Sequence, residues 1–387
     1  MNMKYLGLDQ QSLVELGAIY TAKEISQQPQ VWGKVYEGIL AQQQSIREFL
    51  EKALNISERI ILTGAGTSAF IGLSLRGVYQ RKTGIVTEAI STTDLVSHPQ
   101  DYFSADIPTL VISFARSGNS PESAAALMLA DRLCTRCFHL IITCNPDGKL
   151  AHHPAKEKLV YALPEESNDQ SLAMTSSYTG MLLAGLLMAD IKAIPSVKGM
   201  VDTLVKYGEK VISYYAEELR DIARKNFTRA VFLGSGPLFG TATESHLKLQ
   251  ELTDGKVICK HDSFLGFRHG PKAVIDASTL IVYLFSNDPH VLQYERDLVD
   301  SMKKGNPPLL EIGVIESQVR DIKLDHLFYF SENGACLPEE FLAVCSVLPA
   351  QVLSFFRSLA FGLRPDSPSD SGAITRVVQG VNIYPRK

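Results

Sequence analysis

The chain reads IILTGAGTS over residues 60–68 and VFLGSGP over residues 231–237. In each stretch an apolar run ends at a pair of glycines, and a segment of helix-forming residues follows. The apolar run predicts a buried strand, and the glycines predict a tight turn into the helix. Because the same strand–turn–helix pattern occurs twice, the sequence predicts a duplicated α/β unit.

Apolar runs rich in β-branched residues recur along both halves of the chain, separated by segments of helix length. The apolar residues are continuous rather than alternating, which predicts parallel sheets buried on both faces. The expected strands are 60–63, 109–114, 139–143, 159–163, 230–233, 279–285, 309–314 and 326–330. The expected helices are 68–80, 121–133, 174–190, 241–253, 291–304 and 339–361.

The duplicated pattern also predicts how the chain is divided. An amphipathic segment over 198–225 is expected to join the two halves as a long helix. The string Thr21-Ala22-Lys23-Glu24 has capping-box form and predicts a helix start at Thr21. The expected parts are an N-terminal helical extension (1–44), a first α/β domain (45–214), a second (215–365) and an irregular but ordered C-terminal tail (366–387).

The composition argues against several classes of protein. A net charge of −4 over 387 residues does not provide the basic face that a nucleic-acid partner needs. The N-terminus lacks the basic and apolar segments of a signal peptide. The most apolar helix candidate, around 181–189, is too short to cross a membrane. With six scattered cysteines that are expected to be reduced thiols, these features predict a cytoplasmic protein.

Three clusters of hydroxyl residues, two of them with glycines, occur after predicted strands, where an anion could bind. Backbone N–H groups at a helix start lack helical partners, and the helix dipole favours negative charge there. Clusters at the strand ends of one open sheet are expected to converge. They comprise Gly66, Thr67 and Ser68; Arg116, Ser117, Gly118 and Ser120; and Thr175, Ser176 and Ser177.

These clusters also have structural interpretations. The stretch 64–68 suits a simple β–α turn, and Ser120, directly before Pro121, suits a helix N-cap. The sequence has no Walker-type phosphate loop and no convincing dinucleotide fingerprint, so we expect neither nucleotide-triphosphate chemistry nor a nicotinamide cofactor. Since no set of metal ligands at a recognisable spacing is evident, no metal or other cofactor is expected.

A second group of residues suits proton transfer. Glu244, Lys248 and Glu251 share one face of a predicted helix, because they are spaced i, i+4, i+7. Such a row is equally typical of a solvated row of ion pairs that contributes little stability. His269, in the loop string GFRHGPK over 266–272, is a candidate general acid or base, although a lone histidine is more often structural.

Several strings together resemble the SIS (sugar isomerase) superfamily. The chain is similar to the isomerase half of glucosamine-6-phosphate synthase and, more closely, to the bacterial galactosamine-6-phosphate deaminase/isomerase family, also called tagatose-6-phosphate ketose isomerases. The strings are LTGAGTSAFIG (62–72), STTDLV (91–96), SFARSGNSPES (113–123), AMTSS (173–177), LGSG (233–236), ESHLKLQELTDGK (244–256), GFRHGPK (266–272) and RVVQGV (376–381).

The resemblance implies two α/β/α SIS units with parallel, five-stranded, flavodoxin-like sheets, and it assigns residue roles. The family's phosphate-binding hydroxyls fall on Ser68, Ser117 and Ser120, with Thr175 as the match in the third cluster. The proton-shuttling glutamate falls on Glu251, and its polar helix neighbours fall on Glu244 and Lys248. The ring-opening histidine falls on His269; in the synthase it comes from the partner subunit, which implies at least a homodimer with a shared active site.

Two positions depart from the synthase. Ala115-Arg116 replaces a Ser-Gln pair, so Arg116 is expected either to supply a charge that replaces a lost hydroxyl or to contact another substrate oxygen. The synthase lysine that forms a Schiff base aligns with Arg376, and a guanidinium stays protonated and does not form that imine readily. Arg376 is therefore expected to bind substrate rather than to act covalently.

The implied reaction converts D-galactosamine 6-phosphate and water to D-tagatose 6-phosphate and ammonia. Three alternatives stay open at this point: a deaminase or deglycase for another amino-sugar phosphate, a plain aldose–ketose phosphosugar isomerase, and a non-catalytic sugar-phosphate sensor. A sensor would need the phosphate loops but not Glu251 and His269 together, so their presence favours an enzyme.

Overall fold

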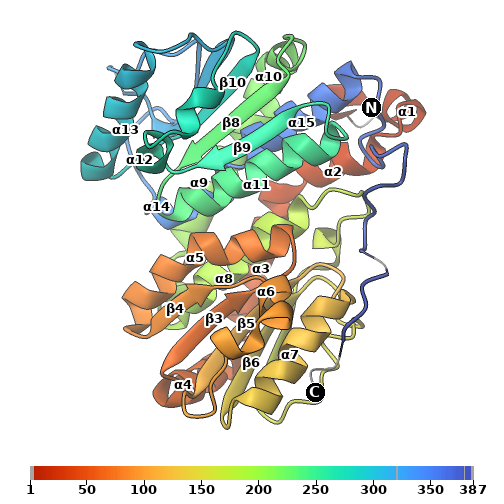
Figure 1. The fold of residues 1–387 in the computed structure, drawn as a ribbon, viewed down its shortest axis with the longest axis vertical. Helices are drawn as coiled ribbons and strands as arrows, with labels where there is room; N and C mark the ends of the chain where they lie inside the picture. The colour runs from red at the N-terminus through yellow and green to blue at the C-terminus, as the bar shows by residue number, and fades with distance from the viewer. Residues whose placement is uncertain (1–3, 320, 379, 385–387) are drawn as a thin grey trace. The chain divides into compact units, whose positions relative to one another are not determined.

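The computed structural model describes residues 4–319, 321–378 and 380–384 (Figure 1). The chain forms two compact units, each assembled from segments that are distant in sequence. The first-sheet unit comprises Gln30–Asp169, Ser176–Val201 and Thr375–Lys387, and the second-sheet unit comprises Met1–Pro29, Gln170–Thr175 and Asp202–Ile374. The helices α1 (Gln10–Glu15) and α2 (Ile19–Ser26) thus belong with the second sheet, whereas the described residues from Thr375 onward belong with the first.

The first-sheet unit is built on a five-stranded sheet in which every neighbouring pair is parallel. Its spatial order is β4-β3-β5-β6-β7, so the earliest strand lies between the second and the third. This is the doubly wound, flavodoxin-like order, as predicted. The strands are β3 (Arg59–Thr63), β4 (Val86–Ala89), β5 (Thr109–Ala115), β6 (Cys137–Thr143) and β7 (Lys158–Ala162).

Helices cover both faces of this sheet (Figure 1). On one face, Ile61 and Val111 pack with Ala126 and Ala130 of α7. The other face is covered by α5, which packs on β3, β4 and α8. The helices are α3 (Gln28–Ala41), α4 (Gln43–Ile56), α5 (Thr67–Thr83), α6 (Thr92–Ser97), α7 (Pro121–Leu133) and α8 (Ser176–Ala189).

The second-sheet unit repeats the same topology. Its parallel sheet has the order β12-β11-β10-β8-β9, which is the first sheet's order read from the other end. A short antiparallel pair, β1 (Lys4–Tyr5) with β2 (Leu8–Asp9), also lies in this unit. The sheet strands are β8 (Arg229–Gly234), β9 (Ile258–Asp262), β10 (Thr279–Leu284), β11 (Leu310–Ser317) and β12 (His326–Ser331).

Helices again cover both faces of the second sheet. Val231 and Ile281 share an apolar cluster with Phe264 of α12 and Leu298 of α13, while α11 packs on β8, β9 and α15. The helices are α1 (Gln10–Glu15), α2 (Ile19–Ser26), α9 (Lys198–Lys210), α10 (Ala216–Ala223), α11 (Pro237–Leu252), α12 (Phe264–Phe267), α13 (Pro289–Met302), α14 (Glu339–Cys345) and α15 (Leu348–Ala360).

One helical stretch, Glu339–Ala360, is long and apolar enough to pass for a membrane span by length and composition alone. Its most apolar 18-residue window is 94% buried inside the protein, where α15 packs against α2, α10 and α11. A core helix passes the same test, so the apolar character of this stretch is explained by its packing.

The two glycine turns have the same backbone conformation. Gly66 precedes α5 with φ 55° and ψ −129°, and Gly236 precedes α11 with φ 54° and ψ −128°. Residues with a Cβ rarely adopt this region. The preceding glycine serves close packing, because a Cβ on Gly64 would lie 2.6 Å from the carbonyl carbon of Ser68. The duplication predicted from the sequence is therefore confirmed at the level of single torsion angles.

All the predicted strands and helices are present, with three differences in detail. The edge strands β4 and β9 were not predicted, because strings such as Ile258-Cys-Lys-His-Asp262 carry too few apolar residues for a core strand. The segment 339–361 divides into α14 and α15, and the segment 198–225 is helical with a π-turn at Val211–Tyr215.

The predicted capping box at residues 21–24 is wrong. The helix α2 begins at Ile19, so Thr21 and Glu24 lie inside it and both are buried. Thr21 Oγ1 instead donates to Asp366 Oδ1 at 2.8 Å, and Glu24 accepts hydrogen bonds from the backbone N–H groups of Gln170 and Ser171. These polar groups therefore fix tertiary contacts of the second-sheet unit rather than a helix start.

The conformation of Gly66 predicts a specific stability loss. Gly66→Ala should lower the free energy of unfolding by about 1–3 kcal/mol, since alanine is strained in this region of φ and ψ. Gly33→Ala is the matched control, because Gly33 lies inside α3 with nothing within 4 Å of a new Cβ, and it should be neutral or stabilising. Urea unfolding of both variants measures the difference, and equal stability of the two would contradict the assignment.

Candidate active site

The first candidate site is an anion cradle at the carboxyl ends of β3 and β5. These strands are neighbours, with Thr63 paired to Ser113, and the order of strands reverses between them. In open α/β sheets ligands bind at such a reversal. The turn that ends β3 carries Gly66, Thr67 and Ser68, and the loop that ends β5 carries Ser117 and Ser120. The structure therefore brings the first two predicted clusters to adjacent strand ends.

The turn after β3 presents the start of a long helix. Thr67 and Ser68 are the first two residues of α5, and both side chains are at most 5% exposed. The N–H groups of a first helical turn have no helical acceptors, and the helix dipole adds a partial positive charge. This arrangement suits a phosphate dianion.

The conformation of the loop after β5 is stabilised by hydrogen bonds to its own backbone carbonyls. Gly118 has φ 63°, and its carbonyl accepts from the Leu150 N–H at 2.9 Å. The carbonyl of Ser117 accepts from Asn145 Nδ2 at 2.8 Å. Ser120 occupies the N-cap position of α7, but its side chain makes no capping hydrogen bond. The N-cap interpretation therefore explains the position of Ser120 and leaves its hydroxyl available to a ligand.

The third cluster is organised by Asp169, a residue that the sequence did not single out. Its carboxylate accepts from the N–H of Ser176 at 3.1 Å, from the N–H of Ser177 at 2.9 Å and from the hydroxyl of Ser177 at 2.5 Å. The start of α8 thus already holds an internal anion. Thr175, Ser176 and Ser177 are all fully buried.

Arg376 holds the C-terminal tail against this region. Its Nε and one terminal nitrogen donate to the carbonyl of Asp169 at 2.9 and 2.5 Å, and the same terminal nitrogen donates to Asn168 Oδ1 at 3.2 Å. The backbone carbonyl of Arg376 accepts in turn from the guanidinium of Arg116, which is 7% exposed. The two departures from the synthase therefore contact each other. Gln379, within the resembling string 376–381, lies outside the described residues.

The second candidate site is a row of buried charges on α11, in the second-sheet unit. Lys248 Nζ lies 2.6 Å from Glu251 Oε2 and 3.3 Å from Glu244 Oε1. The Glu244 and Lys248 side chains are 0% and 1% exposed, whereas that of Glu251 is 22% exposed. The predicted common face is confirmed, and the alternative of a solvated ion-pair row is excluded.

Electrostatics fix the charge on Lys248. Burial alone would lower the pKa of this lysine, but the neighbouring Glu244 and Glu251 carboxylates outweigh burial, and the pKa of Lys248 is raised. The ammonium stays protonated and orients Glu251 through a charge-assisted hydrogen bond. Glu251, the most exposed member of the row, is the carboxylate that can reach a substrate.

His269 lies on a loop between α12 and the 3₁₀ turn Pro271–Val274. It is exposed, and in the described part of the chain its imidazole makes no hydrogen bond. Gly270 follows with φ 112°, a conformation that favours glycine. The loop therefore presents the imidazole outward.

Among the described residues, one group of metal-binding types comes together, in the first-sheet unit. His139 Nε2 and His153 Nε2 lie 2.8 and 2.6 Å from the two carboxylate oxygens of Asp131. Burial would raise the pKa of Asp131, but the hydrogen bonds from the two histidines outweigh it and the pKa is lowered. Metal-bound imidazoles usually donate their other N–H to an acceptor, and the Nδ1 of His139 is buried without one in the described structure. The three residues thus fit a structural hydrogen-bonded cluster in which one carboxylate bridges two histidines. The sequence did not predict this cluster, because its members are separated along the chain.

Comparisons with known proteins agree with this architecture. The SIS domain family model matches residues 53–190. The D-galactosamine-6-phosphate deaminase AgaS of Shewanella sp. (strain ANA-3) is 41% identical over 384 residues, which cover 98% of this chain and 95% of the relative. The crystal structure of a proposed tagatose-6-phosphate ketose/aldose isomerase from Clostridium novyi NT superposes with a TM-score of 0.97 at 40% identity and covers 100% of both chains.

A more distant relative is the glutamine–fructose-6-phosphate aminotransferase of Pyrococcus horikoshii, which is 26% identical over 90% of this chain and 56% of its own length. The paired sheets and the strand-end cradle define a SIS-domain protein of the sugar-isomerase class. Within that class, the chain belongs to the AgaS family of D-galactosamine-6-phosphate deaminases. The family resemblance inferred from the sequence is confirmed.

The buried row on α11 predicts a large stability effect. Lys248→Met should lower the free energy of unfolding by about 3–5 kcal/mol, because it leaves a buried carboxylate at Glu244 without its counter-charge. The double variant Glu244→Gln/Lys248→Met should recover much of that loss. Lys260→Met, which removes a half-exposed ammonium 3.4 Å from Asp262, is the matched control and should cost under about 1 kcal/mol. Equal unfolding midpoints for the Lys248 and Lys260 variants would contradict the account.

Proposed function

We propose that this enzyme converts D-galactosamine 6-phosphate and water to D-tagatose 6-phosphate and ammonia. The observation that carries the proposal is the Glu244–Lys248–Glu251 row, in which a buried ammonium orients one partly exposed carboxylate. A proton shift between adjacent carbons needs such an oriented base. The names of the AgaS relatives support the choice of substrate.

The first-sheet unit is proposed to bind the phosphate. Ser68, Ser117 and Ser120 would donate hydroxyl hydrogen bonds, and the N–H groups at the start of α5 would add theirs with the favourable helix dipole. Arg116 and Arg376 are proposed to act beside this cradle, where their mutual contact holds the tail. Since the guanidinium of Arg376 is bonded to Asp169 and Asn168, we propose that the reaction proceeds without a covalent imine to the protein.

The chemical steps follow from the assigned groups. His269 promotes ring opening and exposes the C1 aldehyde. Glu251 removes the proton from C2 and delivers it to C1, while O1 gains the proton that the C2 amino group loses, which gives an imine at C2 and a hydroxyl at C1. Water adds to the imine carbon, and ammonia then leaves that carbon. The product that remains is tagatose 6-phosphate, with a ketone at C2. Lys248 and Glu244 act as positioning residues for Glu251.

We propose a homodimer or a larger assembly in which His269 serves the active site of the partner subunit. The exposure of His269 and the lack of a hydrogen bond to its imidazole within the described residues support this assignment. A group offered to another chain is expected to be free of internal partners.

A second candidate activity is aldose–ketose isomerisation without loss of nitrogen. It is favoured by the name of the Clostridium novyi structural relative and by the fact that the same C2–C1 proton shift serves both reactions. Ammonia and ketose are both measured with galactosamine 6-phosphate, with glucosamine 6-phosphate and with an aldose 6-phosphate that has no amino group. If the sugar without an amino group forms as much ketose as the amino sugars, and neither amino sugar releases ammonia, the isomerase is favoured.

The role of Glu251 predicts a kinetic loss. Glu251→Gln should reduce kcat for ammonia release by about 10²–10⁴-fold, the usual contribution of a positioned general base, while the unfolding midpoint stays close to that of the wild type. Glu217→Gln, which alters an exposed carboxylate on α10, is the matched control and should keep full activity. Unchanged ammonia release by the Glu251 variant would refute its role.

Sharing of His269 between subunits predicts complementation. The variants Glu251→Gln and His269→Asn should each be inactive alone. After the two are denatured together and refolded, random pairing into dimers should restore about a quarter of the wild-type activity, because half of the sites in each mixed dimer are intact. No recovery in a preparation shown to contain mixed dimers would place His269 in the same chain's site.

A further inference from the structure

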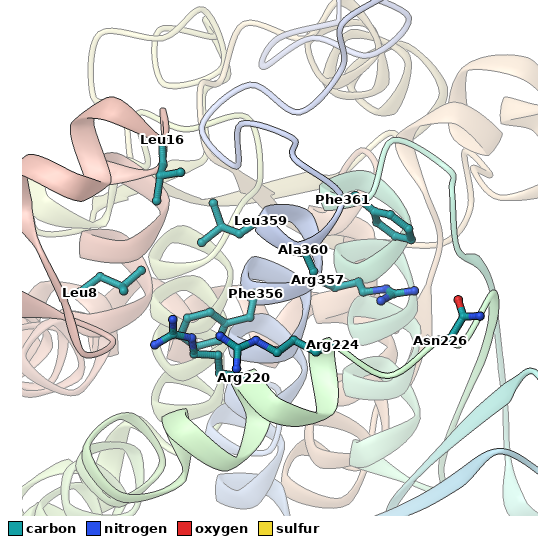
Figure 2. A pocket seen from close by; sticks show the side chains of 10 residues that line it. All are labelled: Leu8, Leu16, Arg220, Arg224, Asn226, Phe356, Arg357, Leu359, Ala360 and Phe361. Carbon is teal, nitrogen blue, oxygen red and sulfur yellow. The ribbon is translucent and has the colours of Figure 1, made fainter.

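A basic pocket lies in the second-sheet unit, on side chains to which the proposed reaction assigns no role. It has a volume of about 560 Å³, within the range of small-molecule sites. Figure 2 shows its walls: arginines from α10, the end of α15, and two leucines of the N-terminal segment. The lining residues are Leu8, Leu16, Arg220, Arg224, Asn226, Phe356, Arg357, Leu359, Ala360 and Phe361.

The positive charge of this pocket is poorly neutralised by the protein. Arg220 and Arg357 form no ion pair with a carboxylate in the described structure, and Arg224 contacts Asp221 at 3.2 Å on the exposed surface. Arg220 and Arg224 stand four residues apart on α10, and like charges at that spacing repel each other on a common helix face. An anion between them would convert this repulsion into attraction.

Arg357, one of the residues that line the pocket, is a buried cation with only 5% exposed. Its terminal nitrogens donate to the carbonyls of Ala223 and Phe227 at 2.9 and 2.8 Å, and its Nε is buried without a hydrogen-bond partner in the described residues. The carbonyl bonds explain Arg357 as a cap on the C-terminus of α10. They leave its charge without a counter-ion, and burial lowers the pKa of its guanidinium.

The remaining walls suit an apolar group attached to the anion. The guanidinium carbon of Arg357 lies 4.1 Å from the ring centre of Phe361, and that of Arg220 lies 5.8 Å from the ring centre of Phe356. Leu8, Leu16 and Leu359 add aliphatic surface beside these rings. A guanidinium that stacks on an aromatic ring directs its N–H groups along its own plane. A planar or tetrahedral oxyanion in that plane can accept hydrogen bonds from them.

We propose that this pocket binds a phosphomonoester with an apolar or ring-shaped body, at a site separate from the sugar-phosphate cradle of the first-sheet unit. Arg220 and Arg224 bind the phosphate oxygens, Arg357 supplies a fixed positive charge, and the phenylalanines contact the body of the ligand. The location also links the pocket to the catalytic helix: α15 packs along α11, and Lys256, just after α11, lies 5.6 Å from the ring of Phe361.

Phenyl phosphate is a suitable probe, because it combines a dianion with one aromatic ring. Isothermal titration at low ionic strength compares the full-length wild type with Arg220→Gln/Arg224→Gln. The loss of two charge-assisted contacts should weaken binding at this site at least about tenfold. Ammonia release by the double variant in the absence of the probe should equal that of the wild type, which shows that the variant is folded.

Two control variants separate this site from other sources of binding. Lys303→Gln/Lys323→Gln removes the same charge from exposed positions of the same unit, and Ser68→Ala/Ser117→Ala impairs the proposed sugar-phosphate cradle. Both should retain the binding that the arginine variant loses. Equal weakening by the lysine variant would indicate surface charge alone, and loss in the serine variant with retention in the arginine variant would place all binding in the cradle. Either result, or no binding to the wild type, would overturn the proposal.

Discussion

The proposed chemistry depends on the buried ammonium of Lys248. This ammonium contacts two carboxylates on one helix, and its removal would leave the fully buried Glu244 without its counter-charge. Glu244 is fully buried, whereas Glu251 is partly exposed, so the row runs from the protein interior to the surface. The fixed ammonium orients a single carboxylate, which is the arrangement that a proton shift between neighbouring carbons requires.

The duplicated fold gives the two units the same backbone frame for two different candidate sites. Both use the same glycine turn, with torsion angles that agree within a degree, to start a helix at the end of a central strand. In the first-sheet unit that helix start is surrounded by hydroxyl groups and N–H donors, which suit an anion. In the second-sheet unit the charged residues 244, 248 and 251 lie about two to four turns further along the helix. The same backbone conformation thus precedes two different sets of polar side chains.

The sequence predicted the core of each sheet because central strands are continuously apolar. It missed β4 and β9 because edge strands are partly exposed and can be polar. The spacing of Glu244, Lys248 and Glu251 predicted that they share one face of a helix. Whether such a row is a solvated set of ion pairs or a candidate catalytic group depends on its burial. The burial depends on how α11 packs, which the spacing does not show. Asp169 and its partner Arg376 could not be paired from sequence, since 207 residues separate them and no local motif contains both.

The central claim is that one oriented carboxylate carries a proton from C2 to C1 of the sugar. The most direct measurement is NMR analysis of tagatose 6-phosphate formed in ordinary water from galactosamine 6-phosphate deuterated at C2. Transfer by a single, partly shielded base predicts that part of the deuterium appears at C1 of the product. A product that carries only solvent hydrogen at C1, even at the earliest times of a single turnover, would contradict the account.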